Sequence, residues 1–349
     1  MFSQKQWRVV VLDEAQAIKN MATKRSRAAM SLKAHFKLTT TGTPLENNLG
    51  ELWNLFQFIN PGLLGTINQF NRRFAGPIER DKDLDCQRRL RRLIAPFILR
   101  RLKSQVLDEL PPRTEINLQV TLSEEEAVFY ESLRREAIQR LESSGERDGN
   151  RPLRILAEIM RLRRACCHPD LVAPDAGIES AKLAVFAETI DELLANRHKV
   201  LVFSQFVDHL AIIKNFLDER GLSYQYLDGA TPPRQRKLRV EAFQAGQGDL
   251  FLISLKAGGL GLNLTAANYV IHLDPWWNPA VEDQASDRAH RIGQKLPVTI
   301  YRLITKGTIE EKIVALHRDK RELAENLLKG TEVGGQVSAD ELLRLLRAD

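Results

Sequence analysis

Alternation of apolar strands with helical segments is the feature that most constrains the fold of this chain. From Ala181 onward, five short apolar runs have the length of strands, and segments with helical spacing separate them. The runs are residues 200–203, 224–227, 250–254, 269–273 and 298–303. Repeated alternation of strand and helix predicts a parallel sheet covered by helices on both faces. The expected fold class is therefore α/β.

Two further runs near the N-terminus also have the character of strands. Residues 8–12 end abruptly at Asp13 and Glu14, and residues 36–40 end at Thr41. The first run is apolar on both faces, which is typical of a buried parallel strand. Ligand groups of open α/β sheets lie where such strands end, so we expect the two acids to mark a site.

The segment from about Asp85 to His168 is predicted to be helical, because a capping-box pattern at residues 123–126 precedes apolar residues at helical spacing. Arginines cluster in this segment. On charge alone, a solvated helix face and a face that contacts phosphate are equally good interpretations. A polar break at residues 143–151 and a linker at residues 173–180 follow.

Composition excludes several classes of protein. Hydrophobic residues make up 43% and charged residues 28% of the 349 residues, values that support two folded domains rather than a disordered chain. The net charge of +6 permits a polyanionic partner without requiring one. No apolar run approaches the roughly 18 residues of a membrane span, so no membrane partner is expected. The three cysteines form neither an even disulfide set nor a metal-binding pattern, which favours a reducing compartment and argues against a zinc site at residues 166–168.

The acid pair suits hydrolysis of a nucleotide. An aspartate such as Asp13 can hold Mg²⁺, directly or through water, while an adjacent glutamate such as Glu14 polarises the attacking water. Two adjacent acids also commonly form a solvated turn, and short motifs match by chance. The meaning of this pair therefore depends on the rest of the chain.

A polar pattern lies near the C-terminal end of the strand-helix region. Gln284, Asp287, Arg288 and Arg291 fall at positions i, i+3, i+4 and i+7 of an expected helix and would form a polar stripe along it. Two arginines three residues apart can both reach a γ-phosphate. The alternative is a surface helix with an internal ion pair between its acid and its last arginine.

A glycine-rich segment, residues 254–263, follows a predicted strand, so its backbone N–H groups can approach a phosphate, and Lys256 adds charge. It is not the phosphate-binding loop GxxxxGK(S/T), a pattern that these 349 residues do not contain. Farther on, Trp276 and Trp277 either stack on bases or, as is more common for paired tryptophans, pack in a core or between domains.

Seven blocks, taken in order and with their spacing, resemble the Swi/Snf-type ATPases of helicase superfamily two. They are VVLDEAQAIKN, TTTGTPLENNLGELW, PFILRRLKSQVLDELPPR, VLVFSQF, LDGAT, SLKAGGLGLNLTAANYVIHLDPWWNP and QASDRAHRIGQ. The resemblance covers the chain to about Leu328. It implies two RecA-like lobes with ATP bound between them, an inserted helical protrusion, and ATP-driven translocation along double-stranded DNA.

The resemblance also implies roles for individual residues. Asp13 is similar to the Mg²⁺ ligand, Glu14 to the water-activating acid, and Arg288 and Arg291 to arginine fingers. The positions that resemble nucleotide-binding residues are Gln284, Asp287 and Gly261. Those that resemble residues coupling hydrolysis to motion are Gln16, where many relatives carry His, and Thr41, Gly42 and Thr43. Those that resemble contacts to the DNA backbone are Ser204, Gln205, Thr231, Lys256 and Gly258.

The resemblance implies four regions. Residues 1–84 correspond to the C-terminal part of the first RecA-like lobe, 85–180 to a helical protrusion and linker, 181–330 to the second RecA-like lobe with a C-terminal helix, and 331–349 to a tail. The family carries its Walker A loop well upstream of the acid pair, whereas Asp13 lies close to the start of this sequence. We therefore expect an incomplete first lobe, the C-terminal part of a DNA-dependent ATPase, and no ATP hydrolysis by the isolated chain.

The function expected is translocation on double-stranded DNA with displacement or remodelling of a bound protein that the sequence does not identify, with ATP and Mg²⁺ as cofactors. The alternative is a non-enzymatic module that binds DNA or a partner, because the Walker A half is missing. An RNA helicase is disfavoured, since the HRIGQ and LDPWWNP blocks resemble the duplex-DNA branch. The expected location is cytoplasmic, with the nucleoid in a bacterium, or nuclear in a eukaryote.

Overall fold

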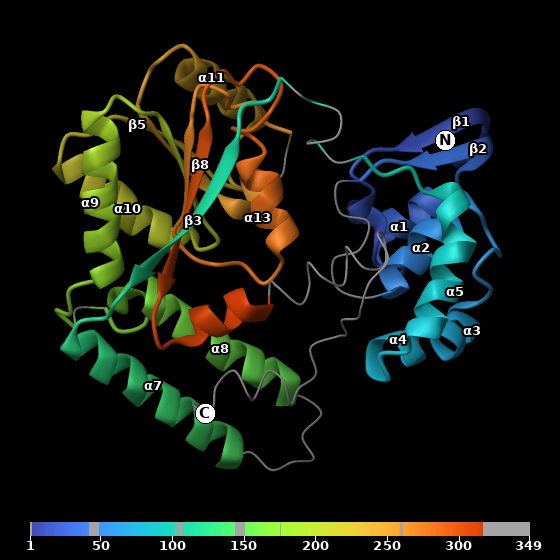
Figure 1. Ribbon diagram of the computed structural model, residues 1–349, viewed down its shortest axis with the longest axis horizontal. Coiled ribbons are helices and arrows are strands. Elements are labelled where there is room, and N and C mark those ends of the chain that lie inside the picture. The colour runs from blue at the N-terminus through green and yellow to red at the C-terminus, as the bar shows by residue number, and fades with distance from the viewer. Residues whose placement is uncertain are drawn as a thin grey trace. The chain divides into compact units, whose positions relative to one another are not determined.

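The structure is a computed structural model that describes residues 2–41, 49–101, 103, 107, 109–143, 151–174, 176–258 and 261–316. Contacts between residues divide the chain into two compact units. The first contains Met1–Arg101 and Asn278–Ala280, and the second contains Leu102–Trp277 and Val281–Leu316 (Figure 1). The first unit therefore extends beyond the predicted boundary at residue 84, and the second begins well before residue 181.

The first unit is built on two parallel strands, β1 (Gln6–Leu12) and β2 (Lys33–Thr39). Helices α1 (Lys24–Met30) and α2 (Leu49–Ile59) complete this part. Val10 and Leu12 of β1 pack against a small core that contains Ala15, Ile18, Ala29, Leu55 and Phe58. Both strands predicted near the N-terminus are confirmed.

The expectation that β1 is buried on both faces is wrong. Val9, Val11, Phe36 and Leu38 are each between 43% and 58% exposed, and the register places Val9 opposite Phe36 and Val11 opposite Leu38. These four side chains form an apolar patch on one face of the pair. Among the described residues, the small core covers only the opposite face of the two strands.

Short helices complete the first unit: α3 (Ile67–Phe70), a π-helix (Asn71–Ala75), α4 (Gly76–Arg80) and α5 (Leu84–Ile94). The carboxylate of Asp83 caps α5 by accepting a hydrogen bond from the Cys86 amide at 2.9 Å. Cys86, Leu90 and Ile94 recur every four residues and are buried against α2 and its neighbours. The four arginines of α5 lie at other positions of the helix, Arg88, Arg89, Arg91 and Arg92.

The second unit contains a six-stranded sheet in which every pairing is parallel. The strands are β3 (Arg113–Val120), β4 (Val200–Ser204), β5 (Tyr224–Leu227), β6 (Leu250–Ser254), β7 (Tyr269–His272) and β8 (Val298–Thr305). Their order across the sheet is β3-β8-β7-β4-β6-β5. The five strands predicted after Ala181 are confirmed, as is the α/β fold class.

Helices cover both faces of this sheet. They are α9 (Ala181–Ala195), α10 (Val207–Glu219), α11 (Pro233–Gln244), α12 (Leu255–Gly258) and α13 (Pro279–Ser286). Val200 and Val202 of β4 face the core formed with α9 and α10, whereas Leu201 and Phe203 face the core formed with α11 and α13. Strands buried on both faces explain the continuous apolar runs in the sequence.

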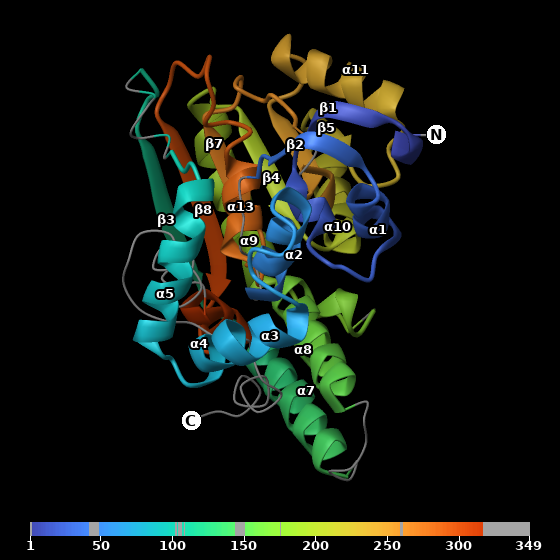
Figure 2. The same cartoon turned by 90° about the vertical axis from the view of Figure 1, so that its right-hand side faces the viewer.

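Two long antiparallel helices, α7 (Glu124–Ser143) and α8 (Arg151–Cys167), lie side by side in the second unit (Figure 2). The predicted capping box forms, since the Ser123 and Glu126 side chains accept each other's backbone amides at 3.2 and 3.1 Å. The two helices share a core with Ile309 and Ile313 of the helical residues 309–316. No helix in the described ranges is both long and apolar enough to cross a membrane.

The helical prediction for residues 85–168 is wrong at β3. This strand joins the sheet as an edge strand, in register with β8 from Arg113 opposite Val298 to Val120 opposite Thr305. Ile116, Leu118 and Val120 alternate with polar residues, a period of two that indicates a strand. The signal was therefore present, but it is short and lies between strongly helical segments.

Candidate functional site

The acid pair lies at the end of β1, beside the end of β2. The Thr40 hydroxyl donates a hydrogen bond to Oδ1 of Asp13 at 2.6 Å, and the Glu14 amide donates to the same oxygen at 2.9 Å. These two bonds lower the pKa of Asp13, because each favours the charged carboxylate. Asp13 therefore presents an anionic oxygen ligand at the end of a parallel strand.

Glu14 is connected to the second strand through Gln16. The Gln16 amide donates to Oε2 of Glu14 at 2.6 Å, and the Thr41 hydroxyl donates to Oε1 of Gln16 at 2.9 Å. Glu14 has a φ of 49°, a left-handed conformation that is uncommon for residues other than glycine and that often occurs at functional sites. The structure thus brings together three predicted residues. Gly42 and Thr43 lie outside the described residues.

The donor set at this site fits Mg²⁺. This ion prefers hard oxygen ligands and usually binds one or two carboxylates together with substrate phosphates and waters. Asp13 is the residue that could hold it, while the carboxylate of Glu14 is oriented by the Gln16 amide. The arrangement can hold a metal and a polarised water next to each other.

The predicted DNA contacts gather at one edge of the second sheet. Ser204 ends β4, Thr231 follows β5 and Lys256 follows β6, and parallel strands have their carboxyl ends at the same edge. Gln205 comes directly after Ser204, and Gly258 is the last residue of α12.

The two hydroxyl groups at this edge of the sheet donate hydrogen bonds to carboxylates of the loops there. Ser204 is 1% exposed and donates to Oδ1 of Asp274 at 2.5 Å. Thr231 is 8% exposed and donates to Oδ1 of Asp228 at 2.9 Å. In this structure the two hydroxyls therefore shape the loops, and Lys256 is an exposed cation at the edge.

The polar stripe expected at residues 284–291 is wrong, because α13 ends at Ser286 and residues 287–293 form turns. We call residues 287–293 the arginine turn. Arg288 is 6% exposed, whereas Arg291 is exposed. The Arg288 carbonyl accepts from the Leu264 amide at 3.0 Å, and Arg291 donates to the Leu262 carbonyl at 3.5 Å. The two arginines thus lie beside the loop that begins at Gly261.

Arg163 is a residue of this unit that sequence reasoning missed. It lies on the core side of α8 and is fully buried. Its guanidinium donates to the Pro275 carbonyl at 2.6 Å and lies 3.6 Å from Oδ2 of Asp274. The guanidinium carbon lies 5.4, 5.6 and 5.3 Å from the ring centroids of Phe206, Trp276 and Trp277. An arginine four residues after Ile159, in line with buried residues, was the available signal.

The two tryptophans pack as core residues. Trp276 packs against the core between the sheet, α11 and α13, and Trp277 packs against the core of α7 and α8. Asp274, just before them, accepts from the Ser204 hydroxyl and from the Gln205 amide at 3.2 Å. The buried carboxylate of Asp274 therefore joins α8 to the end of β4, where Ser204 and Gln205 are predicted DNA contacts.

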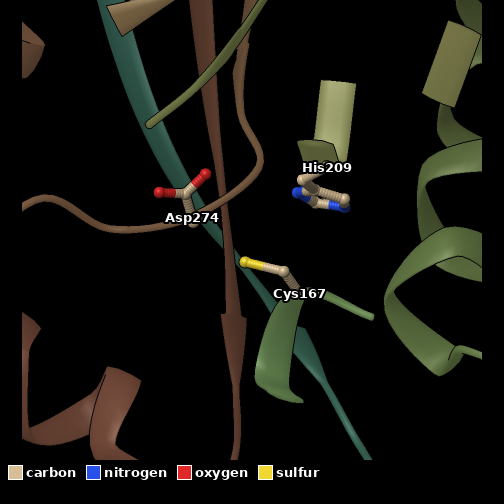
Figure 3. A group of neighbouring side chains, drawn as sticks. All are labelled: Cys167, His209 and Asp274. Carbon is tan, nitrogen blue, oxygen red and sulfur yellow. The ribbon is translucent and has the colours of Figure 1, made fainter. Parts of the chain in front are cut away.

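Three side chains near Arg163 have the types that bind metals: Cys167 of α8, His209 of α10 and Asp274 (Figure 3). Their ligand atoms lie within 4.8 Å of one another, and all three residues are buried. Burial lowers the pKa of His209 well below its ordinary value and raises the pKa of Cys167 well above it, so both are neutral.

The charges around these three residues argue against a metal ion. Burial raises the pKa of Asp274 to about 6, although Arg163 and the Ser204 hydroxyl oppose this shift. The Asp274 carboxylate is balanced by Arg163, and the nearby Lys182 by Glu310 at 2.6 Å. A divalent cation would add charge to a buried region that is already balanced, at a large cost in desolvation.

The fold defines a parallel-sheet α/β protein with RecA-like lobes, in which an acid pair lies at a strand end. A SNF2-related domain profile matches residues 1–171, and the profile of the helicase conserved C-terminal domain matches residues 182–293. The SWI2/SNF2 ATPase core of Sulfolobus solfataricus is 35% identical, with a TM-score of 0.57 over 100% of this chain and 72% of that one. The same core in complex with dsDNA is 33% identical, with a TM-score of 0.55, and the match covers 99% of this chain and 72% of that one. The chain belongs to the SWI2/SNF2 family.

Curated relatives in the family include bacterial and human proteins. The chain is 40% identical over 347 residues to the putative ATP-dependent helicase/translocase YwqA of Bacillus subtilis, covering 97% of this chain and 37% of that protein. It is 37% identical over 367 residues to the SWI/SNF-related matrix-associated actin-dependent regulator of chromatin subfamily A member 1 of Homo sapiens, covering 99% and 34%. The chain therefore spans about a third of the length of these relatives.

Proposed function

We propose that this chain belongs to an enzyme that hydrolyses ATP to translocate along double-stranded DNA, and that it displaces or remodels protein bound there. The observation that carries the proposal is the hydrogen-bonded chain from Glu14 through Gln16 to Thr41, beside the Asp13 carboxylate. The Sulfolobus core was solved in complex with dsDNA, which supports a duplex as the partner. We expect the protein to be associated with the DNA of its cell.

Each residue of the acid site has a part in the proposed hydrolysis. Asp13 would hold Mg²⁺, which would supply positive charge for the phosphates of ATP, and Glu14 polarises the water that attacks the γ-phosphate. Gln16 fixes the Glu14 carboxylate by donating to it at 2.6 Å. Because the same side chain accepts from Thr41, a change at Glu14 on hydrolysis is passed to the end of the neighbouring strand.

The test is the Glu14→Gln variant of the full-length protein that carries this chain. Duplex-stimulated ATP hydrolysis should fall by about 10²- to 10⁴-fold, the usual contribution of a positioned acid or base. ATP binding and the unfolding temperature should not change, since Glu14 is not in the core. Glu219→Gln, at an exposed position on α10, is the matched control.

Translocation is measured separately, by displacement of a third DNA strand from a triplex. The wild type should displace the strand in an ATP-dependent manner, and the Glu14→Gln variant should not. A wild-type protein that binds duplex DNA but neither hydrolyses ATP nor displaces the strand would contradict the proposal and support the non-enzymatic binding module.

DNA binding should depend on salt rather than on sequence. Lys256 is an exposed cation at the sheet edge, and no base-reading helix is evident in the sequence, so phosphate contacts should dominate. Lys256→Ala should weaken binding to all duplexes alike and reduce the slope of log affinity against log salt by about 1. Titration of unrelated duplexes by fluorescence anisotropy at several salt concentrations measures both quantities.

The matched control is Lys214→Ala, which removes an exposed lysine from α10. It should leave the affinity and the salt slope unchanged. A strong preference for one duplex sequence, together with a flat salt slope, would refute the prediction of phosphate contacts.

A further inference from the structure

Hydrogen bonds and ion pairs hold the arginine turn to residues that come immediately after the first unit in the chain. Lys103 lies 2.8 Å from Oδ1 of Asp287 and also donates to the His290 carbonyl at 3.0 Å. Arg113 donates to the same Asp287 oxygen at 3.3 Å. The Nε2 atom of His290 donates to the Pro111 carbonyl at 2.8 Å. Asp287 and His290, the first and fourth residues of the turn, are therefore both bound by the segment that follows Arg101.

Arg113 connects the turn to the end of the preceding helix. Its guanidinium lies 2.7 Å from Oδ1 of Asp283, in α13, and 2.6 Å from Oε1 of Glu115, its neighbour in β3. Asp283 and Asp287 are four residues apart, so a single arginine holds both carboxylates where the helix ends. This contact ties the last turn of α13 to the first residue of the arginine turn.

A different segment anchors the other side of the turn. The Leu264 amide donates to the Arg288 carbonyl at 3.0 Å, and the Gln294 side chain donates to the carbonyls of Thr265 and Ala267 at 3.1 and 2.8 Å. The loop before β7 thus supports one side of the turn, and Lys103, Pro111 and Arg113 support the other. Only the second set follows directly on the boundary at Arg101.

We propose that Lys103 and Arg113 are positioning residues that set the orientation of the arginine turn through Asp287. This inference rests on the proposed function and on the predicted role of Arg288 and Arg291 as arginine fingers. Asp287 then acts by holding the turn rather than by binding the nucleotide.

The exposure of the ion pair between Lys103 and Asp287 indicates a positioning role and not a role in stabilising the fold. The Lys103 side chain is 41% exposed and that of Asp287 is 32% exposed. Exposed ion pairs contribute little to the free energy of unfolding. Misplacement of a catalytic group by about 1 Å, in contrast, can reduce a rate by about 10²-fold. The pair of Lys103 and Asp287 should therefore matter for turnover more than for stability.

The experiment compares Lys103→Met, Asp287→Asn and the conservative Lys103→Arg in the full-length protein. With saturating duplex, the first two should lower kcat for ATP hydrolysis by about 10-fold, with small changes in KM and in the unfolding temperature. Lys103→Arg should keep most of the activity, because it keeps the charge. Asp249→Asn is the matched control, since it removes the carboxylate that pairs with Lys199 at 3.2 Å elsewhere in the second unit.

A second measurement does not depend on turnover. Amide hydrogen exchange over residues 287–293 should be faster in Lys103→Met and Asp287→Asn than in the wild type and in Asp249→Asn. Unchanged exchange and unchanged kcat in both variants, with turnover abolished in Arg291→Ala, would overturn the positioning role and leave the proposed function standing. A wild type without duplex-stimulated hydrolysis would overturn the proposed function, and the exchange data would then show whether the network holds the turn.

Discussion

Replacing Arg291 by alanine is expected to reduce duplex-stimulated ATP hydrolysis by about 10³- to 10⁵-fold, the contribution of an arginine finger to phosphoryl transfer. Arg291 is exposed on the arginine turn, and its hydrogen bond to the Leu262 carbonyl is long, at 3.5 Å. The fold should therefore tolerate the change. Steady-state ATP hydrolysis at saturating duplex, together with the unfolding temperature, measures the two effects.

Arg288→Ala should lose turnover similarly but should also lower stability, because Arg288 is 6% exposed. Lys295→Ala, which removes an exposed cation four residues after Arg291, is the matched control and should retain normal turnover. A loss of less than about fivefold in Arg291→Ala would mean that the turn is only a structural element, since an arginine finger contributes far more than this.

Replacing Arg163 by methionine is expected to lower the free energy of unfolding by about 3–5 kcal/mol, because it leaves the other charge of a buried ion pair without its counter-charge. The side chains of Arg163 and Asp274 are 0% and 1% exposed and lie 3.6 Å apart. Methionine keeps much of the apolar contact with the surrounding rings, so the loss reports mainly on the charge. Urea unfolding at neutral pH measures it.

The pH dependence of this loss identifies its cause. Arg163 lowers the pKa of Asp274, which burial has raised to about 6, so the pKa should rise further in Arg163→Met. The carboxyl group then becomes neutral at a higher pH, and the loss of stability should shrink as the pH falls toward about 5. A loss that is independent of pH would point to lost packing instead.

The matched control for this variant is its neighbour in the chain. Arg164 pairs with Asp208, and its side chain is 34% exposed. Arg164→Met should therefore cost less than about 1 kcal/mol, the range measured for exposed ion pairs. Equal losses in the two variants would contradict the assignment of Arg163 to a buried charge pair.

The sequence by itself determined the parallel sheet and the place of the acid pair. Continuous apolar runs such as residues 200–203 and 250–254 become β4 and β6, because a strand buried on both faces needs no polar residues. The acid pair is placed at a strand end by the abrupt change after Leu12. The seven sequence blocks also identified the family, since their order and spacing can be read directly from the sequence.

Only the tertiary structure decided features that depend on contacts between distant residues. The alternating residues of β3 become a strand by pairing with β8, which follows much later in the chain, in spite of strongly helical neighbours in the sequence. The helix that was expected to carry Arg288 and Arg291 ends at Ser286, and Lys103 and Arg113, which are distant in the sequence, hold the Asp287 carboxylate that follows. Arg163 is buried because Asp274, which is distant in the sequence, supplies its counter-charge. Local periodicity cannot show such partners, because the free energy that they contribute arises only when the chain has folded.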